Sequence, residues 1–217
     1  MNIINEITNE IVSRAKNGDT IHKLARRIGF AYSAVYKWVK ILESYDVIYL
    51  TDKGNKTILE INQNPVYKKI VELHNAIVVI EKDRKFWDLA KNSKLRFRFV
   101  NSTAVPIWTK GGYIPGDFIE RIYYLEVEKN DVKKLKDELS KYRISYSEDN
   151  ITEERPFIYI IKKDKLIIDI KDKLQVMPLK ELVDWCKFLY LDKILEELSS
   201  MYNLNLKNKY SEVLTNL

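Results

Sequence analysis

The feature that most constrains the fold is a pair of short amphipathic segments within residues 20–48, separated by Gly29. Apolar side chains at helical spacing line one face of the first segment: Ile21, Leu24, Ala25 and Ile28. The same spacing lines one face of the second segment: Val35, Trp38, Val39 and Leu42. Glycine fits a helix end because it enters the left-handed conformation without a Cβ penalty. We therefore predict two helices joined by a tight turn, the first capped by Asp19 or Thr20.

The opposite face of the second predicted helix is aromatic, polar and basic. It carries Tyr32, Ser33, Tyr36, Lys37 and Lys40. After this helix, residues 47–50 and 57–61 read as two strands, because both are rich in apolar and β-branched side chains. The six residues between them contain Gly54, and they place Lys53 and Lys56 at the tip of the predicted hairpin.

These residues resemble a helix-turn-helix motif. The motif has a small residue at Ala25, a glycine four positions later at Gly29, and an aliphatic residue six positions beyond that at Val35. Its remaining apolar positions are filled by Leu24, Ile28, Phe30 and Trp38. A hairpin directly after the second helix is similar to the wing of winged-helix regulators.

The resemblance implies a DNA-binding transcriptional regulator. Helix 31–45 would read the major groove, and the wing 47–62 would touch the DNA backbone or the minor groove. The DNA-binding residues it implies are Tyr32, Ser33, Tyr36, Lys37, Lys40, Lys53 and Lys56. Two other interpretations stay open: a plain helical hairpin packed in a core, and a winged-helix module that docks a protein.

The distribution of charge agrees with a nucleic-acid partner. The net charge of +6 over 217 residues is unevenly spread. Residues 20–56 hold seven Lys or Arg against three acids, and residues 65–110 hold ten against four. From residue 111 onward, 18 basic residues face 20 acidic ones. A positive first half would attract phosphates, although a solvated basic face gives the same count.

Composition narrows the class of protein. An apolar content of 46% with 31% charged residues describes a soluble folded chain. We expect neither a membrane span nor a signal peptide, since there is no 18-residue apolar run and no cationic flank before an apolar segment. The single cysteine, Cys186, agrees with a cytoplasmic protein and is expected to be a buried core thiol. His22 and His74 are far apart, and no zinc spacing occurs.

The expected fold class is α/β (α+β): an N-terminal winged helix-turn-helix, a helical linker and a C-terminal mixed α/β domain with a small sheet. We place the DNA-binding domain at 1–64, with a first helix in 2–17. The linker or dimerisation element is placed at 65–92, because Pro65 suits the first position of a helix with apolar residues at helical spacing. The third domain, at 93–217, is expected to sense an effector or bind a partner.

Within this last domain the patterns predict a mixed sequence of elements. Strands are expected at 95–100 (with one basic face), 121–128 and 142–147. Segments 157–161 and 166–170 are expected to pair as a hairpin. A short helix capped from 101–103, a helix capped by Asn130 or Asp131, and one or two closing helices after Pro178 complete the domain. Residues 203–217 carry little information.

The order of these elements gives a second resemblance, to the C-terminal domain of abortive-infection-type antitoxins and to degenerate nucleotidyltransferase-like domains. Gly111 and Gly112 match the glycine turn of the transferase motif, and Asp169 matches its third carboxylate. Asp117 and Glu120 are three residues apart and would face opposite ways on a strand. Glu126 and Glu128 have the right spacing but are expected at a strand edge or a solvated face. We therefore expect no catalytic residue, metal or cofactor, and a ligand at Gly111, Gly112 and Tyr113.

The sequence thus predicts a cytoplasmic regulator with double-stranded DNA as partner. A homodimer is expected, together with a small-molecule effector or a protein partner on the C-terminal domain and no membrane association. The alternatives are an antitoxin-like protein that autoregulates its operon and neutralises a partner, and a nucleotidyltransferase-like enzyme.

Overall fold

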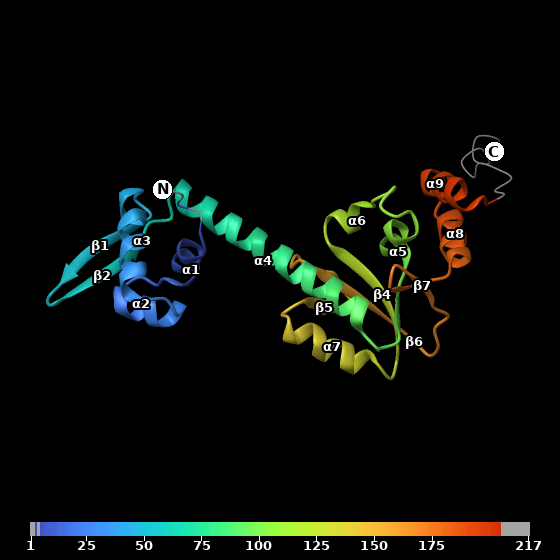
Figure 1. Cartoon of the computed structure of the whole chain (residues 1–217), viewed down its shortest axis with the longest axis horizontal. Helices are drawn as coiled ribbons and strands as arrows, with labels where there is room; N and C mark the ends of the chain where they lie inside the picture. Colours follow the sequence, from blue (N-terminus) through green and yellow to red (C-terminus); the bar gives the residue numbers. More distant parts are fainter. Residues whose placement is uncertain (1–2, 4, 205–217) are drawn as a thin grey trace. The chain divides into compact units, whose positions relative to one another are not determined.

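The computed structural model describes residues 3 and 5–204 and mixes helices with two small sheets (Figure 1). The chain divides into two compact units, Met1–Val78 and Val79–Leu217. The boundary falls inside helix α4 (Pro65–Asn92). Residues 65–92 are therefore one helix that contributes residues to both units.

The first unit is built from three helices and a hairpin. These are α1 (Glu6–Arg14), α2 (Ile21–Ile28), α3 (Tyr32–Ser44), β1 (Ile48–Lys53) and β2 (Lys56–Ile61), followed by the first part of α4. Its core contains the two predicted apolar faces except Trp38, which is only partly buried. The buried members are Ile11, Val12, Ile21, Leu24, Ala25, Ile28, Val35, Val39, Leu42, Val47, Ile48, Leu59 and Ile70.

The helix ends of this unit follow local rules. The side chain of Asn5 accepts a hydrogen bond from Thr8 N and caps α1, so this helix is shorter than the predicted 2–17, of which residues 2 and 4 lie outside the described residues. Thr20 caps α2, and Gly29 ends it with φ +80°. Asp19 does not cap α2, because its carboxylate is engaged by Arg27 and by Lys16 N.

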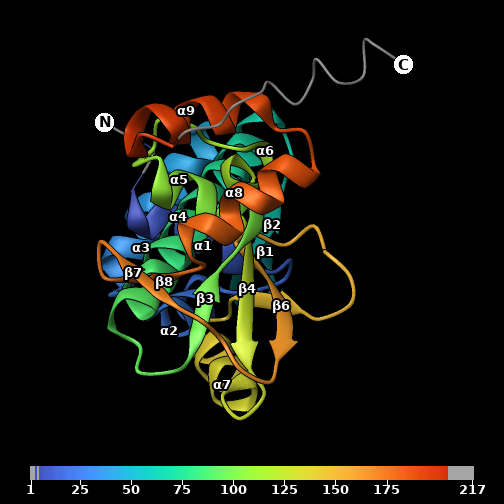
Figure 2. The ribbon, with the colours of Figure 1, turned by 90° about the vertical axis from the view of Figure 1, so that its right-hand side faces the viewer.

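The second unit contains a six-stranded sheet with the order β5-β6-β4-β3-β8-β7. The strands are β3 (Phe97–Phe99), β4 (Ile122–Glu128), β5 (Ser145–Ser147), β6 (Phe157–Lys163), β7 (Asp169–Lys171) and β8 (Leu174–Val176). Strands β4, β5 and β6 are mutually parallel, and β3 is antiparallel to β4. Figure 2 shows β4 between β3 and β6.

Within its described residues, this unit contains five further helices: α5 (Asn101–Trp108), α6 (Gly116–Ile119), α7 (Val132–Lys141), α8 (Leu179–Phe188) and α9 (Asp192–Tyr202). One core joins the sheet to its helices. Phe97 and Phe99 of β3 belong to it together with Leu125 of β4, and so do side chains of α5, α7, α8 and α9. Phe86, from the last turns of α4, stacks on Tyr123 of β4 with ring centroids 5.2 Å apart. The end of α4 is therefore an integral part of the second unit.

The predicted hairpin of 157–161 with 166–170 is wrong. Strand β6 lies between β4 and β5 and pairs in parallel with both, whereas β7 pairs antiparallel with β8 at the opposite edge of the sheet. Strand β8, only three residues long, was not predicted. An apolar run such as that of β6 indicates a buried strand but does not identify its partners.

Other predictions for this unit need smaller corrections. The expected strands at 95–100 and 142–147 are each only three residues long. No side-chain hydrogen bond caps α5 or α7, and Asp131 instead accepts a hydrogen bond from Arg96 N. The predicted basic face is represented within β3 by Arg98, which is buried between two carboxylates.

Two further expectations concern the thiol of Cys186 and membrane-spanning helices. Cys186 is fully buried in the second core, as predicted, and burial raises the pKa of its thiol to about 12. Among the helices of the described residues, none combines the length and the apolar character needed to span a membrane.

Candidate nucleic-acid interface

Helix α3 presents one buried face and one exposed face. Val35, Val39 and Leu42 are completely buried. The five residues predicted on the opposite face are all exposed, and Tyr32 and Tyr36 keep 43% and 42% of their surface accessible. The predicted α3 site residues therefore form one continuous exposed surface.

Aromatic rings form a row across this surface. The ring of His22, from α2, stacks on Tyr32 with centroids 4.2 Å apart and planes inclined by 21°. Tyr32 in turn lies beside Tyr36, at 6.0 Å and 29°. His22 was not predicted as a site residue, since helical spacing relates residues within one helix and not across a turn.

The hairpin is held against the start of α2 by its backbone. Strands β1 and β2 are antiparallel and leave only Gly54 and Asn55 as the turn, with Gly54 at φ +61°. The amide of Gly18 donates to the carbonyl of Leu59 at 2.8 Å, and Leu59 N donates to the carbonyl of Asp19 at 2.7 Å. The hairpin is therefore fixed relative to α2, and its tip carries Lys53 and Lys56 in register.

A cavity of about 330 Å³ lies where α2, α3 and the hairpin turn approach each other. Its lining combines the aromatic row with the hairpin tip: Thr20, Ile21, His22, Tyr32, Asn55, Lys56 and Thr57. This surface, formed by the exposed face of α3 and the hairpin tip with the cavity between them, is called the α3–hairpin surface below.

Two of the basic residues counted in this region are neutralised by partners. Arg27 Nη2 donates to Asp19 Oδ1 at 2.9 Å, and this guanidinium holds the pKa of the Asp19 carboxyl below its usual range. Lys40 Nζ lies 2.7 Å from Glu43 Oε2, and this contact raises the pKa of the lysine.

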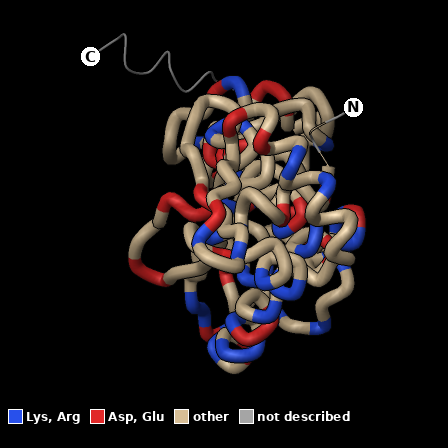
Figure 3. Tube along the Cα trace, turned by 90° about the vertical axis from the view of Figure 1, so that its left-hand side faces the viewer, with Lys and Arg blue, Asp and Glu red and all other residues tan. Residues whose placement is uncertain are grey.

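The other five cations make no ion pair within residues 3 and 5–204: Lys23, Arg26, Lys37, Lys53 and Lys56. Figure 3 marks the Lys and Arg positions along the chain. Among the predicted site lysines, the positive charges of Lys37, Lys53 and Lys56 are therefore not compensated by an ion pair within the described residues. The charge of Lys40 is compensated by Glu43.

In the second unit, the predicted ligand residues lie in the turn after α5. Gly111 has φ +81°, and Tyr113 N donates to Thr109 Oγ1 at 3.2 Å. The side chain of Glu197, from α9, occupies the space in which a Cβ on Gly112 would lie. The glycine turn is therefore closely approached by α9.

The carboxylates named in the transferase comparison have separate partners. Glu126 Oε2 lies 2.6 Å from Arg98 Nη2 and is mostly buried on the interior strand β4, so the expectation of a strand edge or a solvated face is wrong for it. Glu128 pairs with Arg96 at 2.7 Å. Asp117, on α6, accepts a hydrogen bond from Ser102, whereas Asp169 is on strand β7.

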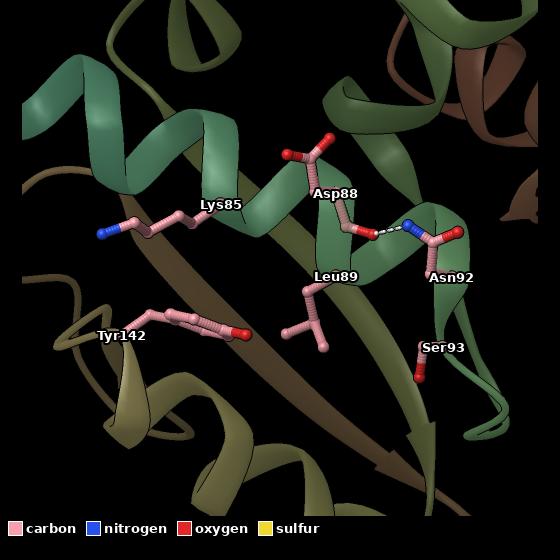
Figure 4. Close-up of a pocket in the computed structure, with 6 residues that line it drawn as sticks. All are labelled: Lys85, Asp88, Leu89, Asn92, Ser93 and Tyr142. Atoms are coloured by element: carbon pink, nitrogen blue, oxygen red, sulfur yellow. Dashed lines mark hydrogen bonds between the residues drawn. The ribbon is translucent and has the colours of Figure 1, made fainter.

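A second cavity, of about 320 Å³, lies in the second unit between the end of α4 and Tyr142, the residue after α7 (Figure 4). It is lined by Lys85, Asp88, Leu89, Asn92, Ser93 and Tyr142. None of the predicted ligand residues lines this cavity. Among the described residues, no three His, Cys, Asp or Glu side chains are grouped so that they can hold a metal ion. No protein-family model, curated protein or solved structure matches the chain.

Proposed function

We propose that the first unit is a winged helix-turn-helix that binds double-stranded DNA and that the protein is a transcriptional regulator. One observation carries the proposal: the α3–hairpin surface joins an exposed helix face to a hairpin tip whose lysines make no ion pair with the residues that the structure describes. Helix α3 would enter the major groove, with the hairpin tip on the backbone or in the minor groove.

The dimensions and charges of α3 support this role. Its 13 residues span roughly 20 Å, and the major groove, about 12 Å wide, admits a helix. Lys37 lies on the exposed face of α3, and Lys53 and Lys56 flank the hairpin turn. Cations on both elements fit a ligand with phosphates on both sides of a groove.

Fluorescence anisotropy with a mixed-sequence duplex of roughly 30 base pairs tests the proposal, since such a probe holds two half-sites one helical turn apart. The slope of log affinity against log salt is expected to fall by about 0.9 for each phosphate contact removed in Lys37→Ala, Lys53→Ala and Lys56→Ala. The matched control is Lys69→Ala, an exposed lysine on α4 that is paired with Glu72. Equal slopes in all four variants and in the wild type contradict the assignment.

A homodimer belongs to the same proposal, because two modules on one duplex would read paired half-sites. Analytical ultracentrifugation checks this directly. A species with twice the mass of one chain is expected in solution at micromolar concentration. A strictly monomeric protein that binds DNA one copy at a time would contradict the homodimer.

A second candidate function is favoured by an exposed apolar corner between α8 and α9. Phe188 is 80% exposed, and Leu189 and Tyr190 beside it are also exposed. Exposed apolar patches mark surfaces that bind other proteins. A partner-binding role for the second unit, as in an antitoxin, predicts that a partner co-purified with the wild type is lost in Phe188→Asp while the melting temperature is unchanged.

A further inference from the structure

The exposed face of α3 is poor in the side chains that most often read guanine and adenine. Arg or Lys bonds to the guanine edge, and Asn or Gln bonds to the adenine edge. Helix α3, Tyr32–Ser44, contains no Arg, Asn or Gln, and of its two lysines Lys40 is paired with Glu43. Its largest exposed side chains are the two tyrosines, so apolar ring surface is a large part of what α3 offers to a base pair, beside Lys37.

The ring of Tyr32 is in contact with two other rings. His22 lies 4.2 Å from it and Tyr36 lies 6.0 Å from it, and both pairs are stacked. A base that binds by stacking needs a free ring face, and these contacts take up ring surface of Tyr32. In a paired duplex the apolar group that projects into the major groove is the thymine methyl. The exposed ring surface of Tyr32 and Tyr36 therefore fits a methyl group in that groove.

The spacing of the rings also fits a duplex. Tyr32 and Tyr36 are four residues apart on one helix face, and their centroids are 6.0 Å apart. Successive base pairs are about 3.4 Å apart along the DNA axis, so two steps span about 6.8 Å. The distance between the rings is of the same order as this two-step rise, which fits contacts with methyl groups on nearby base pairs.

We propose that the α3–hairpin surface recognises thymine methyl groups in duplex DNA, with Tyr32 and Tyr36 as the specificity-determining residues and His22 as a positioning residue. This inference rests on the proposed DNA-binding function and names the base-pair feature that the same surface reads. Lys37, Lys53 and Lys56 then hold the phosphates without selecting a sequence.

Replacing thymine by uracil tests the inference, because uracil lacks only the 5-methyl group and keeps the same hydrogen-bonding edge. The probes are poly(dA-dT) and poly(dA-dU) duplexes at one fixed salt concentration. Each methyl group that is buried against a ring favours binding by about 4-fold, so the wild type is expected to bind the thymine duplex about 4- to 16-fold more tightly.

Two substitutions complete a double-mutant cycle between protein and DNA. In Tyr36→Ala the preference for thymine is expected to fall by about 4-fold, whereas Tyr36→Phe should keep it, since the ring and not the hydroxyl contacts the methyl. The matched control is Tyr45→Ala. Tyr45 follows α3 directly and is 47% exposed, but no stacked contact links it to the row.

The outcomes separate this inference from the function on which it rests. Equal affinity of the wild type for the two duplexes shows that the surface does not recognise the thymine methyl group, and it leaves the proposed DNA binding intact. A preference that survives unchanged in Tyr36→Ala, or tighter binding to single-stranded poly(dT) than to either duplex, also overturns it. Absence of binding to every duplex overturns the proposed function as well.

Discussion

Truncation of Leu42 tests the orientation of α3, on which the proposed interface depends. Leu42 is completely buried, and Val35 and Val39 of the same helix face belong to the same core. Leu42→Ala removes three buried carbon atoms and leaves a cavity in a well-packed core. Substitutions of this kind cost about 2–5 kcal/mol of unfolding free energy.

The melting temperature makes this loss easy to measure. For a unit of 78 residues, 1 kcal/mol corresponds to roughly 4–8 °C. Differential scanning calorimetry of the full chain is therefore expected to show the transition of the first unit lowered by roughly 8–40 °C, with the transition of the second unit unchanged.

Tyr36→Ala is the matched control on the opposite face of α3. Because Tyr36 is 42% exposed, its truncation should change the unfolding free energy by no more than about 0.5 kcal/mol. The same variant should weaken DNA binding. If Tyr36→Ala destabilises the unit as much as Leu42→Ala does, α3 is rotated relative to this description and the interface is assigned to the wrong face.

Three further predictions test single features. Asp19→Asn breaks the pair with Arg27 and should cost about 1–3 kcal/mol at pH 7. Because the pKa of Asp19 is lowered in the fold, this stabilisation is fully present above its unfolded pKa of about 3.9 and is lost as the pH falls through the folded value. The difference between wild type and variant in urea unfolding should therefore shrink steadily as the pH is lowered below about 3.9. Glu126→Gln removes one of the two carboxylates around the buried Arg98 and should lower the stability of the second unit by about 2–4 kcal/mol in calorimetry, whereas an unchanged transition would mean that this pair is solvated. Replacing residues 52–57 by a two-residue turn keeps Thr51 opposite Ile58 and removes both tip lysines. This change should reduce DNA affinity in anisotropy while the melting temperature stays nearly constant, and a large loss of melting temperature would show that the hairpin tip is part of the core.

The first unit was largely predictable because its elements are encoded locally. The period of 3.6 in α2 and α3, the glycine at Gly29 and the strand–turn–strand pattern around Gly54 are each contained in short windows of sequence. The exposed positions of α3 followed from the same period. Local patterns do not report contacts across turns. The stacking of His22 on Tyr32 and the pairing of Asp19 with Arg27 were therefore not predicted.

The second unit was less predictable because its order depends on distant pairing. The alternation around Arg98 correctly indicated a strand. The partners of Arg98, Glu126 and Glu181, are 28 and 83 residues away, so the local pattern did not indicate that this cation is buried. Strand β8 is too short to give a period, and its neighbour β3 is far away in the chain. Parallel pairing of β6 with β4 and β5 likewise leaves no signature in a single apolar run.

Hydrogen exchange measured with and without duplex DNA locates the DNA-binding surface, because it reports protection segment by segment. If the α3–hairpin surface binds DNA, exchange slows in α3, 32–44, and in the hairpin, 48–61, and is unchanged in α7, 132–141. Protection confined to the second unit, or no protection of α3 under conditions in which DNA is bound, would show that α3 is not the DNA-binding element.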